Sequence, residues 1–473
     1  MSDLDAIIAQ IEERRGDFIA LSDTIWGMPE LCYAETRSAA VHAAELKRHG
    51  FKVETGIAGI PTALIGEAGE GGPIIGFLGE YDALPGLSQQ AGIAEPKPIE
   101  ANGAGHGCGH NLLGAGAMLA AVAVAAWLKR EGLPGRVRYY GCPAVEGGAA
   151  KSFMARAGAF KDVAVAISWH PNYFPEVMPA HSLANTRADF TFTGRASHAS
   201  VAPELGRSAL DAVELMNVGV NYMREHMPSD SRVHYAMLDS GGIAPNVVQA
   251  RAKVRYAIRA RDLVGMTDLV RRVSDIARGA ALMTETTVEI NIVSAVSNLL
   301  GNTPLEMALD SVIQQLGPPP FTEADRDFAQ SIQTTLGQQD MESAFATVGL
   351  APFDLPLADR TIPLNASRKP ILGSTDVGDV SWVVPTVQAH GAVVAVGTPF
   401  HSWQLVAQGK SPAAHKGMVH VAKAMAALGV RLFRDKTLRE AALADFTART
   451  ARTPYRCPIP DNVSPPINMS APA

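Results

Sequence analysis

The stretch VVQARAKVRYAIRARD, Val247–Asp262, alternates small or apolar residues with basic ones. Val254 and Tyr256 fall on one face of an extended chain, whereas Arg255 and Arg259 fall on the other. A period of two with one polar face predicts a strand of an antiparallel sheet that is covered on one side only. This strand therefore belongs to a sheet with one solvated face.

The segments around this strand extend the pattern in both directions. Strand-like ADFTFTGRASH is followed by the helical run LGRSALDAVELMNVGVNYMREHM and by the strand-like RVHYAMLDSGG. After the opening stretch come the helical VGMTDLVRRVSDIARGAALMT and the strand-like TTVEINIVSAV. The order strand, helix, strand, strand, helix, strand is that of a ferredoxin-like module. We place this module at residues 186–297.

Residues 1–185 and 298–473 have a different style, with buried strands separated by long helical runs. The strand-like runs are PTALIGE, GPIIGFLGEYD, RVRYYGCPA, VAVAISWH and GAVVAVGTPFHS. This alternation predicts an α/β layered domain with a central mixed sheet. The sequence therefore predicts an α/β domain that is interrupted by a ferredoxin-like α+β domain.

Composition narrows the class of protein and its partners. The net charge of −6 argues against a nucleic-acid partner and against an anionic membrane surface. The four cysteines are too scattered for a disulfide framework, and the N-terminus does not resemble a signal peptide, so we expect a cytoplasmic protein. The apolar run Leu112–Leu128 is rich in Ala, Gly and Val and is predicted to be a buried helix.

Potential metal ligands gather where the predicted strands end. The sequence GHGCGHN precedes the apolar helix, and acidic or imidazole side chains follow four strand-like runs. These residues are Asp82, Cys108, His110, Glu146, His170 and His401. Strand ends on one edge of an α/β sheet converge in space, and Cys, His and Glu there predict a metal centre. A set of this size suits two divalent ions that activate water against an amide or ester.

The chain resembles a known family at several of these motifs. GEYDALPGL, GHGCGHNLLG, GCPAVEGG, GRASHASVAPELGRSALDAV, SGGIAPNVV, GSTDVGDVSW and GTPFHSWQLVAQG are similar to motifs of the di-metal amidohydrolases of the aminoacylase and carboxypeptidase G type. The resemblance extends over nearly the whole chain. It implies a catalytic domain with an inserted lid that also serves for dimerisation, either with a second copy or with a related subunit.

The resemblance also implies roles for single residues. The metal ligands would be Cys108, His110, Glu146, His170 and His401. His198 in the lid would donate to the developing oxyanion, delivered by a partner subunit in one arrangement, and Asn246 would contact the substrate. The general base of the family stands just before the ligand glutamate, which is the position of Val145 in this chain.

The reaction implied is hydrolysis of an N-acyl amino acid by metal-activated water, with zinc or manganese as the ions and p-aminobenzoyl-glutamate as the leading substrate. Valine cannot accept the proton of the attacking water, so Val145 leaves three interpretations open. The residue is an engineered replacement, or the enzyme is slow or uses another acid such as Glu80, or the chain is a binding subunit. A dipeptidase with the same mechanism is a further alternative.

Three more residues are candidates on their own chemistry. Asp82 follows a strand next to the expected ligands and could orient a ligand imidazole, or simply cap a turn. Arg259 could bind a substrate carboxylate through its two-pronged guanidinium, or belong to a solvated strand face. His234, in RVHYAML, faces the same choice between a substrate contact and a surface position.

Overall fold

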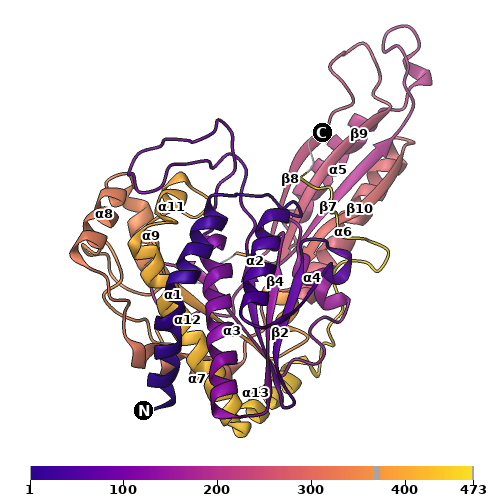
Figure 1. Ribbon diagram of the computed structural model, residues 1–473. Coiled ribbons are helices and arrows are strands. Elements are labelled where there is room, and N and C mark those ends of the chain that lie inside the picture. The colour runs from indigo at the N-terminus through magenta and orange to yellow at the C-terminus, as the bar shows by residue number, and fades with distance from the viewer. Residues whose placement is uncertain (1, 367–372, 471–473) are drawn as a thin grey trace.

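The computed structural model describes residues 2–366 and 373–470. A larger α/β part carries both ends of the chain, and a smaller α+β part projects from it (Figure 1). The smaller part is one continuous stretch, and the larger part consists of the segments before and after it. The fold class predicted from the sequence, an α/β layered domain interrupted by a ferredoxin-like α+β domain, is confirmed.

The larger part is organised around a seven-stranded mixed sheet. In spatial order its strands are β1 (Lys52–Thr55), β2 (Leu64–Glu70), β4 (Gly135–Cys142), β3 (Ile74–Glu80), β5 (Val165–Asn172), β11 (Thr386–Ala392) and β6 (Glu176–Val177). The four neighbours β4, β3, β5 and β11 are parallel. Their carboxyl ends therefore share one edge of the sheet, where ligands bind in open α/β folds.

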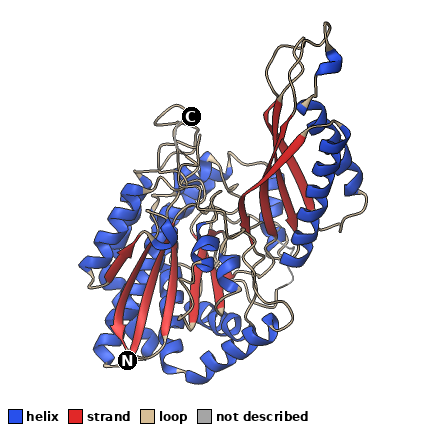
Figure 2. Cartoon of the chain, turned by 90° about the vertical axis from the view of Figure 1, so that its right-hand side faces the viewer, coloured by secondary structure: helices blue, strands red, loops and turns tan. Residues whose placement is uncertain are grey.

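Helices cover both faces of this sheet (Figure 2). One layer contains α1 (Asp3–Trp26), α3 (His110–Glu131) and α12 (Pro412–Arg434), and the other contains the short α4 (Ala150–Arg156) and α10 (Val377–Ser381). Strand β3 is buried along its whole length because it meets both layers: Phe77 joins the first core and Leu78 the second. Its continuous apolar sequence is the expected signature of a doubly covered strand.

The remaining elements of the larger part surround this framework. They are α2 (Thr36–Arg48), the 3₁₀ turn η1 (Ile57–Gly59), α7 (Thr303–Leu316), α8 (Glu323–Gln333), α9 (Gln338–Thr347), α11 (Trp403–Gln408) and α13 (Lys436–Thr450). After α13 the tail continues without regular structure up to residue 470. It lies against the second core through Ile459, which is buried.

Helix α3 carries the apolar run that is long enough to cross a membrane, yet 89% of its most apolar window is buried inside the protein. It packs between α1 and α12 and against β3. Small residues allow this close approach: a Cβ atom at Gly114 would lie 2.5 Å from the carbonyl oxygen of Glu80. The prediction of a buried helix is confirmed.

The smaller part contains β7 (Ala184–Thr193), η2 (Pro203–Leu205), α5 (Ala209–Arg224), β8 (Arg232–Asp239), β9 (Arg251–Ala260), α6 (Leu263–Met283) and β10 (Thr287–Val296). Its sheet is antiparallel, in the order β10-β7-β9-β8, which is the ferredoxin-like order. Val254, Tyr256 and Ile258 of β9 are fully buried beneath α5 and α6. The alternation of apolar and basic residues along Val247–Asp262 therefore corresponds to a sheet that is covered by helices on one face only.

One predicted strand was wrong in position. The apolar run Gly391–Ser402 was expected to form a strand ending at His401, but β11 ends at Ala392. Beyond it the backbone N–H groups of Val393 and Val396 donate to the carbonyl oxygens of Asn172 and Pro356. An apolar run reports burial and does not by itself report pairing in a ladder. His401 is thus held in a loop and not at a strand end.

The close packing of α12 on the sheet gives a test of the core. A Cβ atom at Gly417 would lie 1.8 Å from the carbonyl oxygen of Ala392, which is backbone and has little freedom to move. We expect Gly417→Ala to lower the free energy of unfolding by about 2–3 kcal/mol, as overpacking does. Urea denaturation of the chain measures this loss.

The matched control is Gly16→Ala in α1, where an added Cβ atom has no atom within 4 Å. There the better helix propensity of alanine should raise the free energy of unfolding by roughly 0.5–1 kcal/mol. Equal effects at the two positions would contradict the close approach of α12 to β11.

Candidate metal centre and active site

The loop before α3 brings Cys108 and His110 to the carboxyl edge of the sheet. His110 is the first residue of α3, and Gly109 before it has a left-handed backbone, with φ of 74°. A Cβ atom at Gly107 would lie 2.4 Å from the Leu87 side chain and 3.3 Å from the Cα atom of His401. Glycine at these positions lets the loop turn tightly and pass against the backbone of His401.

Asp82, two residues after β3, binds two parts of the site at once. Its Oδ1 atom lies 2.8 Å from Nδ1 of His110, and its Oδ2 atom accepts a hydrogen bond of 2.9 Å from the backbone N–H of Glu146. Because Nδ1 of His110 is engaged, the Nε2 atom is the one available to a metal ion. The structure thus places Asp82 against the imidazole of a candidate ligand, and its role in orienting that ring stays a prediction.

The turn that carries Glu146 is built from unusual backbone conformations. Ala144 and Ala149 both have positive φ, 57° and 56°, and bracket the Val145–Gly148 segment. The backbone N–H of Ala144 donates to the buried carboxylate of Glu35 at 2.8 Å. Such conformations persist only where the surrounding contacts determine them, and they gather at functional sites.

His401 faces this turn from the loop before α11. Its Nε2 atom lies 3.3 Å from Oε2 of Glu146. Its φ of 59° is also in the left-handed region, and its backbone N–H donates to the carbonyl oxygen of Gly107 at 2.8 Å. The loop of Cys108 and the loop of His401 are thus tied together by their main chains.

Two ligand triads share one cysteine. Ligand atoms of Cys108, His110 and His170 all lie within 4.8 Å of one another, and so do those of Cys108, Glu146 and His401. The Cys108 sulfur lies 3.3 Å from Nε2 of His170. Cys108 is common to both triads, so its thiolate would contribute to both sites if two ions were bound.

The chemistry of these donors fits divalent cations. His110 Nε2, Glu80 Oε2 and Glu146 Oε1 are buried and have no hydrogen-bond partner among the described residues. Burial and the Glu146 charge raise the pKa of the Cys108 thiol, but His170 and His110 outweigh them and lower it to about 6. Cys, His and carboxylate side chains in this number suit divalent metal ions, and buried polar atoms without partners are otherwise costly.

A buried lysine compensates the acids behind the cluster. Lys151 in α4 is fully buried, and its Nζ atom lies 2.6 Å from Oε1 of Glu80 and 2.9 Å from Oδ1 of Asp376. Burial raises the pKa of Glu80, but the charges of Lys151 and His110 outweigh it and lower the pKa overall. Lys151 thus holds Glu80 as a carboxylate with its second oxygen directed at His110, 3.3 Å from its Nε2 atom.

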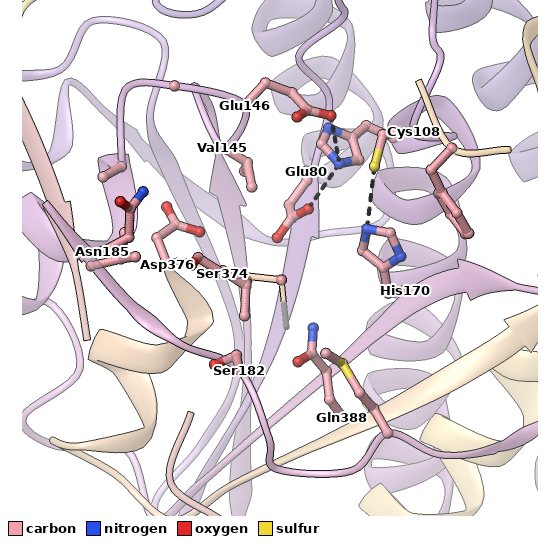
Figure 3. A pocket seen from close by; sticks show the side chains of 18 of the residues that line it. Glu80, Cys108, Val145, Glu146, His170, Ser182, Asn185, Ser374, Asp376 and Gln388 are labelled. Carbon is pink, nitrogen blue, oxygen red and sulfur yellow. Dashed lines mark hydrogen bonds and ion pairs between the residues drawn. The ribbon is translucent and has the colours of Figure 1, made fainter. Parts of the chain in front are cut away.

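The ligand cluster opens into a cavity of about 450 Å³. Figure 3 shows Val145 within it, with Glu80, Glu146 and Cys108 on one side and Asp376 and Asn185 on the other. The volume is in the usual range for a small-molecule site. The position where a general base is expected therefore borders the cavity beside the candidate ligands, and its side chain is apolar.

The structure separates the other predicted site residues into two groups. Arg259, on β9, lines the cavity. His198, Asn246 and His234 do not line it and are exposed on the smaller part. His198 and Asn246 lie side by side there, because the N–H of Ala199 donates to the carbonyl oxygen of Asn246 at 2.9 Å. The roles of all these residues in catalysis stay predictions.

Several residues of the site were missed in the sequence. Lys151, Asn185, Arg187 and Gln388 all bear on the cavity or on its buried acids. Lys151 follows the Glu146 turn in EGGAAK, which was a weak signal. Asn185 and Arg187 lie at the start of the inserted domain, and no local pattern distinguishes them from ordinary strand residues.

Comparisons with known proteins agree with this geometry. Residues 184–285 match the model of a peptidase dimerisation domain. The chain is 46% identical over 466 residues to a subunit of the p-aminobenzoyl-glutamate hydrolase of Escherichia coli (strain K12), covering 96% of this chain and 97% of that protein. The chain belongs to the M20 family of metal-dependent peptidases and amidohydrolases. The family resemblance and the enzyme class predicted from the motifs are confirmed.

Two further comparisons, one with a curated protein and one with a solved structure, also cover most of the chain. The chain is 28% identical to the Xaa-Arg dipeptidase of Mus musculus, covering 93% of this chain and 91% of that one. A dinuclear metal-binding peptidase of the M20 family from Bacillus subtilis has the same fold, with a TM-score of 0.58 and 15% identity, over 89% of this chain and 99% of that one.

The shared cysteine predicts a specific pattern of metal stoichiometry. We expect the native chain to retain two divalent ions after dialysis, and His401→Ala to retain one, because only one triad loses a ligand. Cys108→Ala should weaken both sites together, since its sulfur belongs to both triads. Elemental analysis of dialysed protein measures the ratio, and loss of a single ion from Cys108→Ala would contradict a shared thiolate.

Removing the buried lysine tests the compensation of charge. Lys151→Met leaves Glu80 and Asp376 buried without their common cation, and should lower the free energy of unfolding by about 3–5 kcal/mol. The double variant Lys151→Met/Asp376→Asn should regain part of this loss, because one uncompensated charge is removed. Chemical denaturation of the single and double variants measures the cycle; an additive result would exclude the coupling.

Proposed function

We propose that the chain is a di-metal amidohydrolase that cleaves the amide of N-acyl amino acids, with p-aminobenzoyl-glutamate as the leading substrate. The observation that carries this proposal is the pair of ligand triads sharing Cys108 at the edge of a cavity of about 450 Å³. The E. coli relative is named for the same substrate.

When bound, two divalent ions would polarise the scissile carbonyl and acidify an attacking water. We assign Cys108, His110, His170, Glu146 and His401 as their ligands, with Asp82 orienting His110 through the contact of 2.8 Å. Three imidazoles, a thiolate and a carboxylate favour zinc, and manganese is the alternative.

His198 is suited to the proposed role of oxyanion donor by its local hydrogen bonds. The backbone N–H groups of Ser200 and Val201 donate to its Nδ1 atom, each at 3.3 Å. A neutral imidazole with an accepting Nδ1 carries its proton on Nε2, and His198 is exposed at the surface of the smaller part. Because His198 does not line the cavity of its own chain, we propose that it serves the cavity of a partner subunit in a dimer.

The walls of the cavity favour an acidic amino acid over a basic one. Arg187 and Arg259 both line it, so a leaving group with a positive side chain would face like charges. The Xaa-Arg dipeptidase relative is named for a substrate with a basic residue, which these arginines would disfavour in this chain.

We also propose a cytoplasmic location, with which the four free cysteines agree.

Val145 determines how fast the proposed reaction proceeds. At this position the cavity has no carboxylate that could accept the proton of an attacking water. Glu80 is already engaged with Lys151 through Oε1. We expect Val145→Glu to raise kcat for p-aminobenzoyl-glutamate by about 10² to 10⁴, the usual contribution of a positioned base. The assay is run with Zn²⁺ and separately with Mn²⁺.

The matched control is Val145→Gln, which has the shape of glutamate without its basicity and should not raise the rate. If Val145→Glu gives no increase while calorimetry shows that substrate binds, the chain is a binding subunit and the proposed activity is wrong. If no binding occurs either, another N-acyl amino acid or a dipeptide is the ligand.

A further inference from the structure

One wall of the cavity is formed by the inserted domain and is positively charged. Asn185 and Arg187 of β7 and Arg259 of β9 all line the cavity. In the antiparallel register Asn185 lies opposite Arg259, and Arg187 lies opposite Ala257. Side chains two positions apart on a strand point to the same face, so the three polar groups form one row facing the candidate metal ligands.

The two arginines of this wall have no acidic partner within residues 2–366 and 373–470. The neighbouring Arg255 differs, because its guanidinium lies 2.6 Å from Oδ1 of Asp189. Arg187 is half-buried, and its guanidinium donates to the carbonyl oxygen of Gly147 over a long distance of 3.5 Å. Burial and the nearby Arg259 lower the pKa of Arg187.

Two neighbouring guanidinium groups without an ion-pair partner are unfavourable in a half-buried wall, since each loses solvation and repels the other. A bound dianion would remove both costs, and guanidinium is the side-chain group that reads carboxylates through two parallel hydrogen bonds. The wall is therefore complementary to a ligand with two carboxylates.

The positions along the row suggest which group each residue contacts. The amide nitrogen and the α-carboxylate of an N-acyl amino acid are attached to the same carbon atom, so their partners must be neighbours. Asn185 is buried with an Oδ1 atom that has no partner in the described chain, and its cross-strand neighbour is Arg259. Arg187 lies one pleat further along, beside the Gly147 turn, where a side-chain carboxylate would reach it.

We propose that Arg187 and Arg259 form a two-arginine subsite that selects N-acyl amino acids with a second carboxylate, and that Arg187 determines this selectivity. Arg259 binds the α-carboxylate, Asn185 accepts from the amide N–H, and Arg187 binds the side-chain carboxylate. This inference rests on the proposed function, since it assigns the leaving amino acid to the same cavity. It makes an acidic amino acid such as glutamate the favoured leaving group.

The test is calorimetric and uses the metal-loaded chain with its native Val145, which lacks the base and so binds ligand with little turnover. The probes are p-aminobenzoyl-glutamate and p-aminobenzoyl-glutamine, together with N-acetyl-glutamate and N-acetyl-glutamine. We expect each glutamate ligand to bind at least about tenfold more tightly than its glutamine partner, as a charge-assisted pair provides.

Arg187→Gln should reduce this preference to about one while leaving the affinity for the glutamine ligands unchanged. Arg187→Lys, which keeps the charge without the two-pronged geometry, should retain part of the preference. Arg259→Gln should weaken glutamate and glutamine ligands equally. The matched control is Arg251→Gln on the same strand, which is exposed and should change nothing.

Three outcomes would overturn the inference: no glutamate preference in the native chain, an unchanged preference in Arg187→Gln, or no binding of any of the four probes. Circular dichroism of Arg187→Gln checks its fold, and its loss of one weak contact with Gly147 leaves no acid unpaired. The acetyl pair separates this result from the proposed function, because a wrong acyl group would abolish binding of the p-aminobenzoyl pair alone.

Discussion

Two of the hydrogen bonds made by the carboxylate of Asp82 fix the geometry on which the rest of the site depends. One oxygen is bound to His110 at the start of α3, and the other to the backbone of Glu146 in the turn after β4. These two elements are 36 residues apart and belong to different strand-helix units. A single side chain just beyond β3, which is buried along its whole length, reaches both of them. Asp82 therefore holds the two candidate ligands His110 and Glu146 in place relative to the buried strand β3.

The charges of the cavity are arranged in two opposed walls. The wall formed by the catalytic domain contains carboxylates, imidazoles and the Cys108 thiol. Some of their buried atoms have no hydrogen-bond partner among the described residues, so this wall is suited to binding cations. On the side of the inserted domain, Arg187 and Arg259 line the cavity. Lys151 stands behind the first wall and keeps Glu80 ionised. The proposed substrate is complementary to both walls if its amide carbonyl faces the candidate metal ligands and its carboxylates face the two arginines.

The sequence predicts those features of the structure that follow from a local pattern, and it misses those that depend on a partner far away along the chain. The β9 strand was predicted because its buried residues, such as Val254 and Tyr256, alternate with basic residues in the sequence. Glu146 and His170 were expected at one edge of the sheet because parallel strands end together, whereas His401 reaches that edge from a loop. Their role as metal ligands stays a prediction. The position of the last strand was wrong, because Val393 and Val396 are buried without pairing in the sheet. Lys151 was missed because its partner Asp376 lies 225 residues away, and a lone lysine in a sequence resembles any solvated one.

The inserted domain leaves and rejoins the catalytic domain through two strands that are paired with each other. Asn185 at the start of β7 is opposite Val296 at the end of β10, and both line the cavity. The two walls of the cavity therefore meet at a junction of two paired strands, so a change in the angle between the domains at this junction would change the distance between the arginines and the candidate metal ligands. A ligand that contacts both walls must match that distance.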